Sequence, residues 1–213
     1  MNRPKVLGID LSLTGTGLAG EHWADTIAPP KPPARNAAWR RLTDDERRWA
    51  TVEYRHQRLA AVTGVIRDRY ITSAPDLVVL EGLAYDAYDT DRQLAGLSWK
   101  VRQSLWRLGI PYAIVPPSNL KQFATGNGAA SKAAVLAAAA ARFPWFKGDD
   151  NAADALILVA MGHAALQRPL RAPLGAVELS AVSNCQWPDL EPLRARYAVP
   201  PTSPDTYATT GVI

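Results

Sequence analysis

The chain has 213 residues, a net charge of +4 at pH 7 and 47% hydrophobic residues. This length suits one well-buried domain with some extension and is short for two. No stretch approaches the ~20 apolar residues that span a bilayer, and the N-terminus shows no secretory signal, so we expect a cytoplasmic protein without membrane contact. The single cysteine, Cys185, excludes an intramolecular disulfide and an all-cysteine zinc site. The basic balance fits an anionic partner.

The first 36 residues predict a hairpin followed by a loop. Residues 5–11 form a compact apolar run, and residues 16–23 form a second β-rich segment. Glycine and threonine at residues 14–17 predict the tight turn between them. Residues 28–36 contain clustered prolines, which fix φ and remove hydrogen-bond donors, so this segment is expected to be a loop.

Strands and helices then alternate as far as residue 167. Helical periodicity predicts helices at about 43–70, 91–108, 131–143 and 150–167, and short apolar runs predict strands at 76–81 and 111–115. The first of these helices has an apolar stripe of Trp49, Val52, Leu59, Val62 and Ile66. A hairpin followed by alternating strands and helices predicts an α/β fold with a sheet of mixed direction.

The segment after residue 167 differs in composition from the rest. Seven of the chain's 17 prolines lie between Pro169 and Pro204, and no hydrophobic period holds there. We therefore expect a domain at 1–167 and a proline-rich C-terminal extension at 168–213, which is irregular or packs as a tail over the domain.

Three acidic residues occupy apolar surroundings. Asp10 lies within the first strand, Glu81 ends the apolar run 77–80, and Asp154 shares a helix face with Leu158. A buried, unpaired carboxylate is unfavourable unless it is protonated, paired or bound to metal. Each has a structural alternative: Asp10 could cap a turn, Glu81 could end a strand in solvent, and Asp154 could complement the helix dipole. Together, such oxygen ligands suit Mg²⁺ or Mn²⁺.

Several motifs, in chain order, resemble those of the RuvC-type Holliday-junction resolvases in the RNase H-like superfamily. They are GIDLSLTGTG at 8–17, LEG at 80–82, PSNLK at 117–121, TGNGAASK at 125–132 and DNAADA at 150–155. The resemblance implies an RNase H-like fold, with a mixed five-stranded sheet flanked by helices. It also marks about 24–50 as an insertion into the nuclease domain.

The resemblance further implies a metal-dependent active site. Asp10, Glu81 and Asp154 would bind two Mg²⁺ or Mn²⁺ ions, with Asp10 shared between them, and Lys132 would join them in catalysis. Asn151 stands where relatives usually carry Asp or His, so it would be a weak, uncharged fourth ligand. Asp150 or Asp149 could instead supply the fourth ligand, with Asp150 as the second candidate, or either could simply cap the helix.

Five residues are candidate DNA contacts. Lys132 opens a helix, where a cation opposes the macrodipole, and a DNA phosphate would offset that cost. The preceding turn around Asn127 leaves backbone N–H groups open to an anion. Tyr85, with Tyr88 near it, follows Glu81 and could stack on an unpaired base or simply pack. The remaining candidates are Lys121 and Lys100.

An arginine-rich run surrounds Trp39 and Trp49. Its members are Arg40, Arg41, Arg47, Arg48, Arg55 and Arg58. Such a run is usually a solvated helix face, and DNA contact is the alternative.

The resemblance thus implies a homodimeric, structure-selective endonuclease that resolves four-way DNA junctions. Two other classes stay open. A non-catalytic branched-DNA-binding protein could have kept the fold, and the first motif also occurs in actin-like or sugar-kinase ATP-binding domains. The latter would need a second phosphate-binding loop, which the chain does not show.

Overall fold

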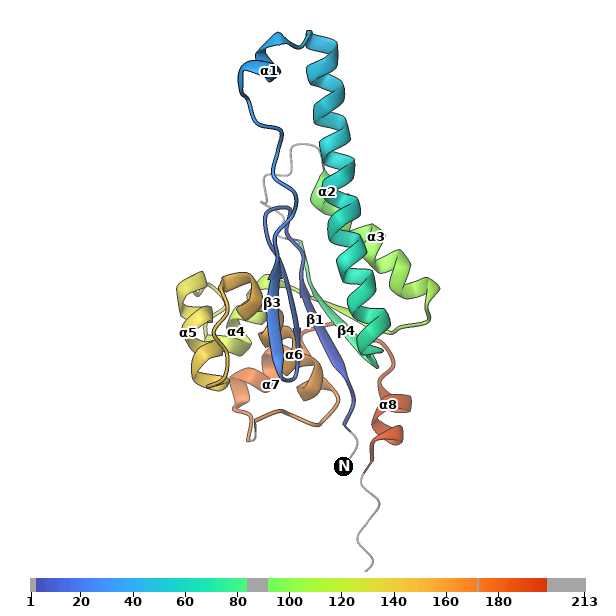
Figure 1. Ribbon diagram of the computed structural model, residues 1–213. Coiled ribbons are helices and arrows are strands. Elements are labelled where there is room, and N and C mark those ends of the chain that lie inside the picture. Colours follow the sequence, from blue (N-terminus) through green and yellow to red (C-terminus); the bar gives the residue numbers. More distant parts are fainter. Residues whose placement is uncertain (1–2, 84–91, 172, 199–213) are drawn as a thin grey trace, which may run out of the picture.

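The computed structural model describes residues 3–83, 92–171 and 173–198, and its centre is a five-stranded sheet (Figure 1). The strands are β1 Val6–Asp10, β2 Thr16–Gly20, β3 Trp23–Ile27, β4 Leu77–Glu81 and β5 Tyr112–Val115. Their order is β3-β2-β1-β4-β5. The first three are antiparallel neighbours, whereas β4 runs parallel to both β1 and β5. The predicted mixed sheet and the predicted hairpin are confirmed.

The fifth strand, β3, was not located from the sequence. The segment 16–23 was predicted as one strand, but β2 ends at Gly20 and the chain turns back at once into β3. This is an edge strand in which Asp25 is exposed and its neighbours are only half-buried. Its hydrophobic pattern is therefore weak. Residues 23–27, most of them assigned to an insertion, pair in the sheet.

Helices cover both faces of the sheet. On one face lie α2 Asp44–Ser73 and α3 Gln93–Arg107, packed on a core that includes Leu7, Ile9, Leu18, Val78 and Leu80. On the other lies α6 Asp150–Ala165, with α4 Pro117–Thr125, α5 Lys132–Arg142 and α7 Ala176–Ser183 around it. The four helices predicted by periodicity are confirmed, with ends that shift by a few residues.

Helix α4 and the helices of the C-terminal segment were not predicted, because prolines at or near their starts were not interpreted as helix-initiating residues. Pro117 stands in the first turn of α4, where its missing N–H has no helical partner in any case. Beyond residue 167, α7 and α8 Glu191–Arg196 form, and α8 again has proline in its first turn. Ala181 and Leu193 are buried, so the expectation of a segment that packs over the domain is confirmed for residues 173–198, and that of an irregular one is not.

The chain from residue 28 to residue 58, hereafter the arm, projects beyond the sheet (Figure 1). It comprises an extended segment, the short helix α1 Ala37–Arg41 and the first half of α2. None of its residues is buried, and Trp49 is 73% exposed, so the predicted apolar stripe is wrong in this half of the helix. The second half of α2 does carry it, with Val62 and Ile66 buried.

Among the helices of the described ranges, none has both the length and the apolar character that a bilayer crossing requires.

Candidate active site

Asp10, Glu81 and Asp154 meet at one edge of the sheet, as predicted. Each offers a carboxylate oxygen, and these oxygens all lie within 4.8 Å of one another. Asp10 is the last residue of β1, Glu81 is the last residue of β4, and Asp154 lies in the second turn of α6. Three acids that are separated by 71 and 73 positions in the sequence therefore form one acidic cluster.

The strands bring the first two acids together. Strands β1 and β4 are parallel neighbours, with Ile9 opposite Leu80, so their carboxyl ends reach the same edge of the sheet.

Two glycines allow α6 to bring in the third acid. A Cβ atom on Gly8 would lie 2.0 Å from the carbonyl oxygen of Ala155, and one on Gly17 would lie 1.9 Å from that of Asn151. Only glycine permits such an approach of a helix backbone to strands β1 and β2. The first turns of α6 are thereby held against the strand that carries Asp10.

Burial raises the pKa values of the three carboxyls, and repulsion within the cluster raises two of them further. Asp10 and Asp154 are 8% and 9% exposed. Desolvation is the largest cause for each acid, and the charge of Asp10 adds to it at the other two. The pKa of Asp154 rises to about 7. The pKa of Glu81 is raised most, to about 10, and a hydrogen bond between the two carboxyls raises the pKa of Glu81 while it lowers that of Asp10. Proton sharing is how a cluster of acids lowers its charge when no cation is bound.

The donor set fits a divalent cation. Three carboxylates within one ion's reach, on rigid elements, match the oxygen ligands that Mg²⁺ and Mn²⁺ prefer. They line a cleft of about 290 Å³. Its other lining residues are Leu11, Ser12, Gly82, Leu83, Leu94, Pro117, Lys121, Lys132, Val135 and Asn151. The cleft is thus lined by three acids and two lysines, a combination suited to a metal-bound phosphate group.

Lys132 opens α5, as predicted, and its Nζ lies 3.0 Å from Asp150 Oδ2. This hydrogen bond is the main cause that raises the pKa of Lys132 and lowers that of Asp150. Lys132 also lowers the pKa values of Asp10 and Asp154, which shows that its charge acts on the acidic cluster. Asp150, the second candidate for a fourth ligand, is thus engaged with a lysine.

The start of α6 separates the roles of Asp149 and Asn151. Asp149 is the N-cap: its Oδ1 accepts hydrogen bonds from the Ala152 backbone N–H and from Thr26 Oγ1, at 3.0 and 2.5 Å. Asn151 lines the cleft, with its amide beside Gly15 in the β1–β2 turn. Its role as a weak ligand stays a prediction.

The other predicted DNA contacts are dispersed. Lys121 lines the cleft and lowers the pKa of Asp154. Asn127 lies in the α4–α5 turn, where its side chain accepts a hydrogen bond from Ala129 N at 2.9 Å. Lys100 lies on α3 beside Arg67 of α2, away from the cleft. Tyr85 and Tyr88 fall outside the described residues. DNA binding by each of these residues stays a prediction.

Two supporting residues were missed from the sequence. Ser12 lines the cleft, and its backbone N–H and C=O both hydrogen-bond Thr16 Oγ1, which closes the turn after Asp10. Thr26 anchors the N-cap of α6. Ser12 could have been found from its place in the 8–17 motif, whereas Thr26 required knowledge of β3.

Neither a protein family model nor a curated protein matches the chain. Among solved structures, Thermus thermophilus RuvC matches with 16% sequence identity and a TM-score of 0.55, over 78% of this chain and 98% of RuvC. A second structure, T. thermophilus RuvC in complex with Holliday junction substrate, matches with 15% identity and a TM-score of 0.54, over 79% and 100%. This chain has the fold of RuvC. The RuvC structures are covered almost completely, whereas about a fifth of this chain has no counterpart in them.

Proposed function

We propose that this protein is a metal-dependent endonuclease that cleaves four-way DNA junctions. The observation that carries the proposal is the cluster of Asp10, Glu81 and Asp154, whose oxygens lie within 4.8 Å of one another at the edge of a sheet with the RuvC fold. The likeness to RuvC in complex with Holliday junction substrate supports branched DNA as the ligand.

The three acids would hold two divalent ions, magnesium or manganese, with Asp10 shared because it lies on the central strand. Such ions supply an activated water and neutralise the charge that develops on the phosphate during hydrolysis. Asn151 would be the fourth, uncharged ligand through its carbonyl oxygen. Burial of the acids favours this binding, since a cation removes the repulsion among them.

The chain's own cations would orient the scissile phosphate. Lys132 and Lys121 line the same cleft as the acids. The bond to Asp150 raises the pKa of Lys132, so this lysine stays charged at neutral pH. The two lysines would bind the phosphate oxygens that face away from the acids, and Lys132 would stabilise the charge of the transition state.

A homodimer would place two such clefts on one junction, because paired cuts need two active sites at a fixed separation. Two large aromatic side chains on α3, Trp99 and Trp106, are 64% and 72% exposed and lie seven residues apart, on one helix face. Exposed aromatic residues of this kind are frequent at protein interfaces. Light scattering of the wild type and of Trp106→Ala tests this part of the proposal.

A non-catalytic branched-DNA-binding protein is the second candidate, and Asn151 is the residue that favours it. An uncharged group there weakens ion binding compared with a carboxylate. Metal-dependent strand cleavage distinguishes the two functions directly.

The test is incubation of the purified protein with a labelled four-way junction and with a linear duplex of matched sequence, in Mg²⁺, Mn²⁺ or EDTA. We expect paired cuts in the junction with either metal, none in EDTA and little cutting of the duplex. Junction binding without cleavage in either metal would overturn the nuclease proposal in favour of the second candidate. Equal cutting of junction and duplex would overturn the selectivity.

A further inference from the structure

The arm concentrates the positive charge of the protein. Residues 28–58 contain eight of the chain's 24 basic residues and four of its 20 acidic residues, so this segment carries the whole net charge of +4. The remaining 182 residues are formally neutral. A net charge confined to one projecting segment is the pattern expected of a surface that meets a polyanion.

Most of the arm's acids are engaged locally. Asp44 and Asp45 pair with Arg47 and Arg48 one turn along α2, at 2.6 and 3.6 Å. The carboxylate of Glu46 accepts a hydrogen bond from the Thr43 backbone and completes the capping box of α2.

Several of the arm's cations, in contrast, have no acidic partner. Within the described parts of the chain, no ion pair involves Lys31, Arg35, Arg40 or Arg41, and all four are exposed. A helix C-terminus accounts for Arg40 and Arg41 in part, since a cation there complements the macrodipole of α1. It does not account for Lys31 and Arg35, which precede the helix.

The arm leaves the sheet at the edge that holds the acidic cluster. Asp10 is paired with Gly17, and the adjacent Thr16 is paired with Ile27, the last residue of β3. The arm begins directly after Ile27 and returns along α2 (Figure 1). The chain therefore departs from the end of the sheet at which the catalytic carboxylates lie.

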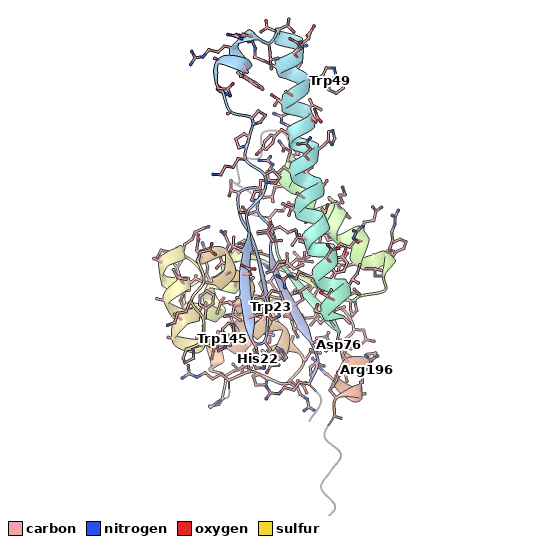
Figure 2. All side chains as sticks on the ribbon, in the orientation of Figure 1. His22, Trp23, Trp49, Asp76, Trp145 and Arg196 are labelled. Carbon is pink, nitrogen blue, oxygen red and sulfur yellow. The ribbon has the colours of Figure 1, made fainter. Side chains whose placement is uncertain are left out.

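The length of α2 sets the reach of the arm. Its 30 residues span about 45 Å. Strand β4 follows the C-terminus of α2 and runs back towards the acidic cluster, where it ends at Glu81; its five residues span only about 17 Å. The helix thus extends roughly 25–30 Å past the acidic cluster, a distance of about 8 base pairs of B-DNA. Figure 2 shows Trp49 near the far end of this projection, where its side chain points sideways from α2, on the side opposite α1.

We propose that the arm is a second DNA-binding surface, which holds backbone phosphates of a duplex segment about 8 base pairs from the catalytic cleft. This inference rests on the proposed function, because it takes the acidic cluster as the position of the scissile phosphate. Phosphate contacts of this kind position a duplex without reading its sequence.

Binding to a labelled 30-base-pair duplex, measured by fluorescence anisotropy in EDTA over a range of KCl concentrations, tests the arm apart from cleavage. The arm variant is Arg35→Gln, Arg40→Gln and Arg41→Gln. The matched control is Arg67→Gln, Arg107→Gln and Arg171→Gln, which removes the same charge from exposed positions outside the arm. All six side chains are solvated, and thermal denaturation checks that both variants fold like the wild type.

The arm variant should bind the duplex about tenfold more weakly than the control at 0.1 M salt, and the slope of log Kd against log salt should fall by about 2 to 3, or ~0.9 for each lost contact. Equal affinities and equal slopes for the arm variant and the control would overturn the proposal. A change of oligomeric state in the arm variant with unchanged duplex affinity would also overturn it, and would indicate that the arm binds a second copy of the chain.

Hydroxyl-radical footprinting of the four-way junction, again in EDTA, locates the contact. The wild type should protect phosphates about 8 base pairs from the branch point, and the arm variant should lose that protection while keeping the protection at the centre. An identical footprint for both proteins contradicts the proposal. A wild type that binds duplex through the arm but cuts no junction in Mg²⁺ or Mn²⁺ would refute the proposed function alone.

Discussion

The acidic cluster and the arm begin at the same edge of the sheet but hold their charges in opposite environments. Asp10 and Asp154 are almost fully buried, and burial together with the charge of Asp10 raises the pKa of Asp154. The arginines of the arm are solvated, and each one alone indicates little. Each buried charge therefore indicates a functional site by itself. Exposed charges become informative only when their distribution over the whole chain is compared.

Replacement of Asp10 by asparagine should give the largest effect. We expect cleavage to fall by at least ~1,000-fold, because the stabilisation supplied by bound ions amounts to several kcal/mol and each ~1.4 kcal/mol is tenfold in rate. Junction binding should persist, and thermal stability in EDTA should rise as one buried acid is lost. Asp25→Asn, an exposed position in the same sheet, is the control and should change none of these. Loss of binding together with cleavage would indicate misfolding.

The two halves of α2 should respond differently to truncation. Ile66→Ala opens a cavity against the sheet and should lower the free energy of unfolding by about 2–5 kcal/mol. Trp49→Ala removes a larger side chain from the arm but should change it by less than about 0.5 kcal/mol. Urea denaturation measures both. Comparable losses would show that the arm is packed against the protein or a partner, contrary to its exposed position.

His163 on α6 is a buried basic residue, and we expect it to make the stability of the protein depend on pH. It is fully buried, and neither ring nitrogen has a hydrogen-bond partner in the described structure. Burial lowers its pKa to about 4; the smaller effect of Glu21 raises the pKa, and that of Arg3 lowers it. The unfolded ring takes up a proton below about pH 6.5 and the folded ring only below about 4. Stability should therefore fall by up to ~3 kcal/mol as the pH drops through this window.

His163→Leu should remove that acid sensitivity. The variant should match or exceed the wild type in stability at pH 7, because no unpaired polar atoms are left buried. Unfolding curves at pH 7, 5.5 and 4.5 provide the measurement. The same decline with pH in variant and wild type would assign the acid sensitivity to other groups.

Of the four predictions, the loss of cleavage rate on replacement of Lys132 should be the smallest effect in free energy. Lys132→Gln should reduce cleavage by about 10- to 100-fold, since one charge-assisted hydrogen bond contributes roughly 1.5–3 kcal/mol. Asp150→Asn removes the same ion pair and keeps the lysine, so it should have little effect on the rate at saturating junction. An equal loss in both variants would mean that the pair serves to position α5 and does not contact phosphate.

The sequence was sufficient to predict the acids because their surroundings contradict their chemistry. Asp10 and Glu81 end apolar strands, and the structure places both at one edge. The edge strand β3 was not visible, because Asp25 and Thr26 interrupt a half-buried pattern. Pro117 closely follows the predicted strand at 111–115 and is compatible with its end, although it also begins α4. A single sequence does not distinguish these two roles of proline, since both satisfy its fixed φ.

The direction of the arm was likewise beyond the reach of sequence patterns. Trp49 and Val62 lie at compatible helical spacing, yet only Val62 is buried. Periodicity reports that a helix has an apolar face, and it does not report where the neighbouring sheet ends. Only the register of β3 with β2 and the length of α2 show that the first half of this helix passes the acidic cluster.

Manganese binding tests the central claim most directly, because it requires no substrate. Crystals grown with Mn²⁺ should show anomalous scattering peaks between the carboxylates of Asp10, Glu81 and Asp154, and Asp10→Asn should abolish or weaken them. Manganese located elsewhere, or equal peaks in the wild type and in Asp10→Asn, would contradict the assignment of this cluster as the metal site of a nuclease.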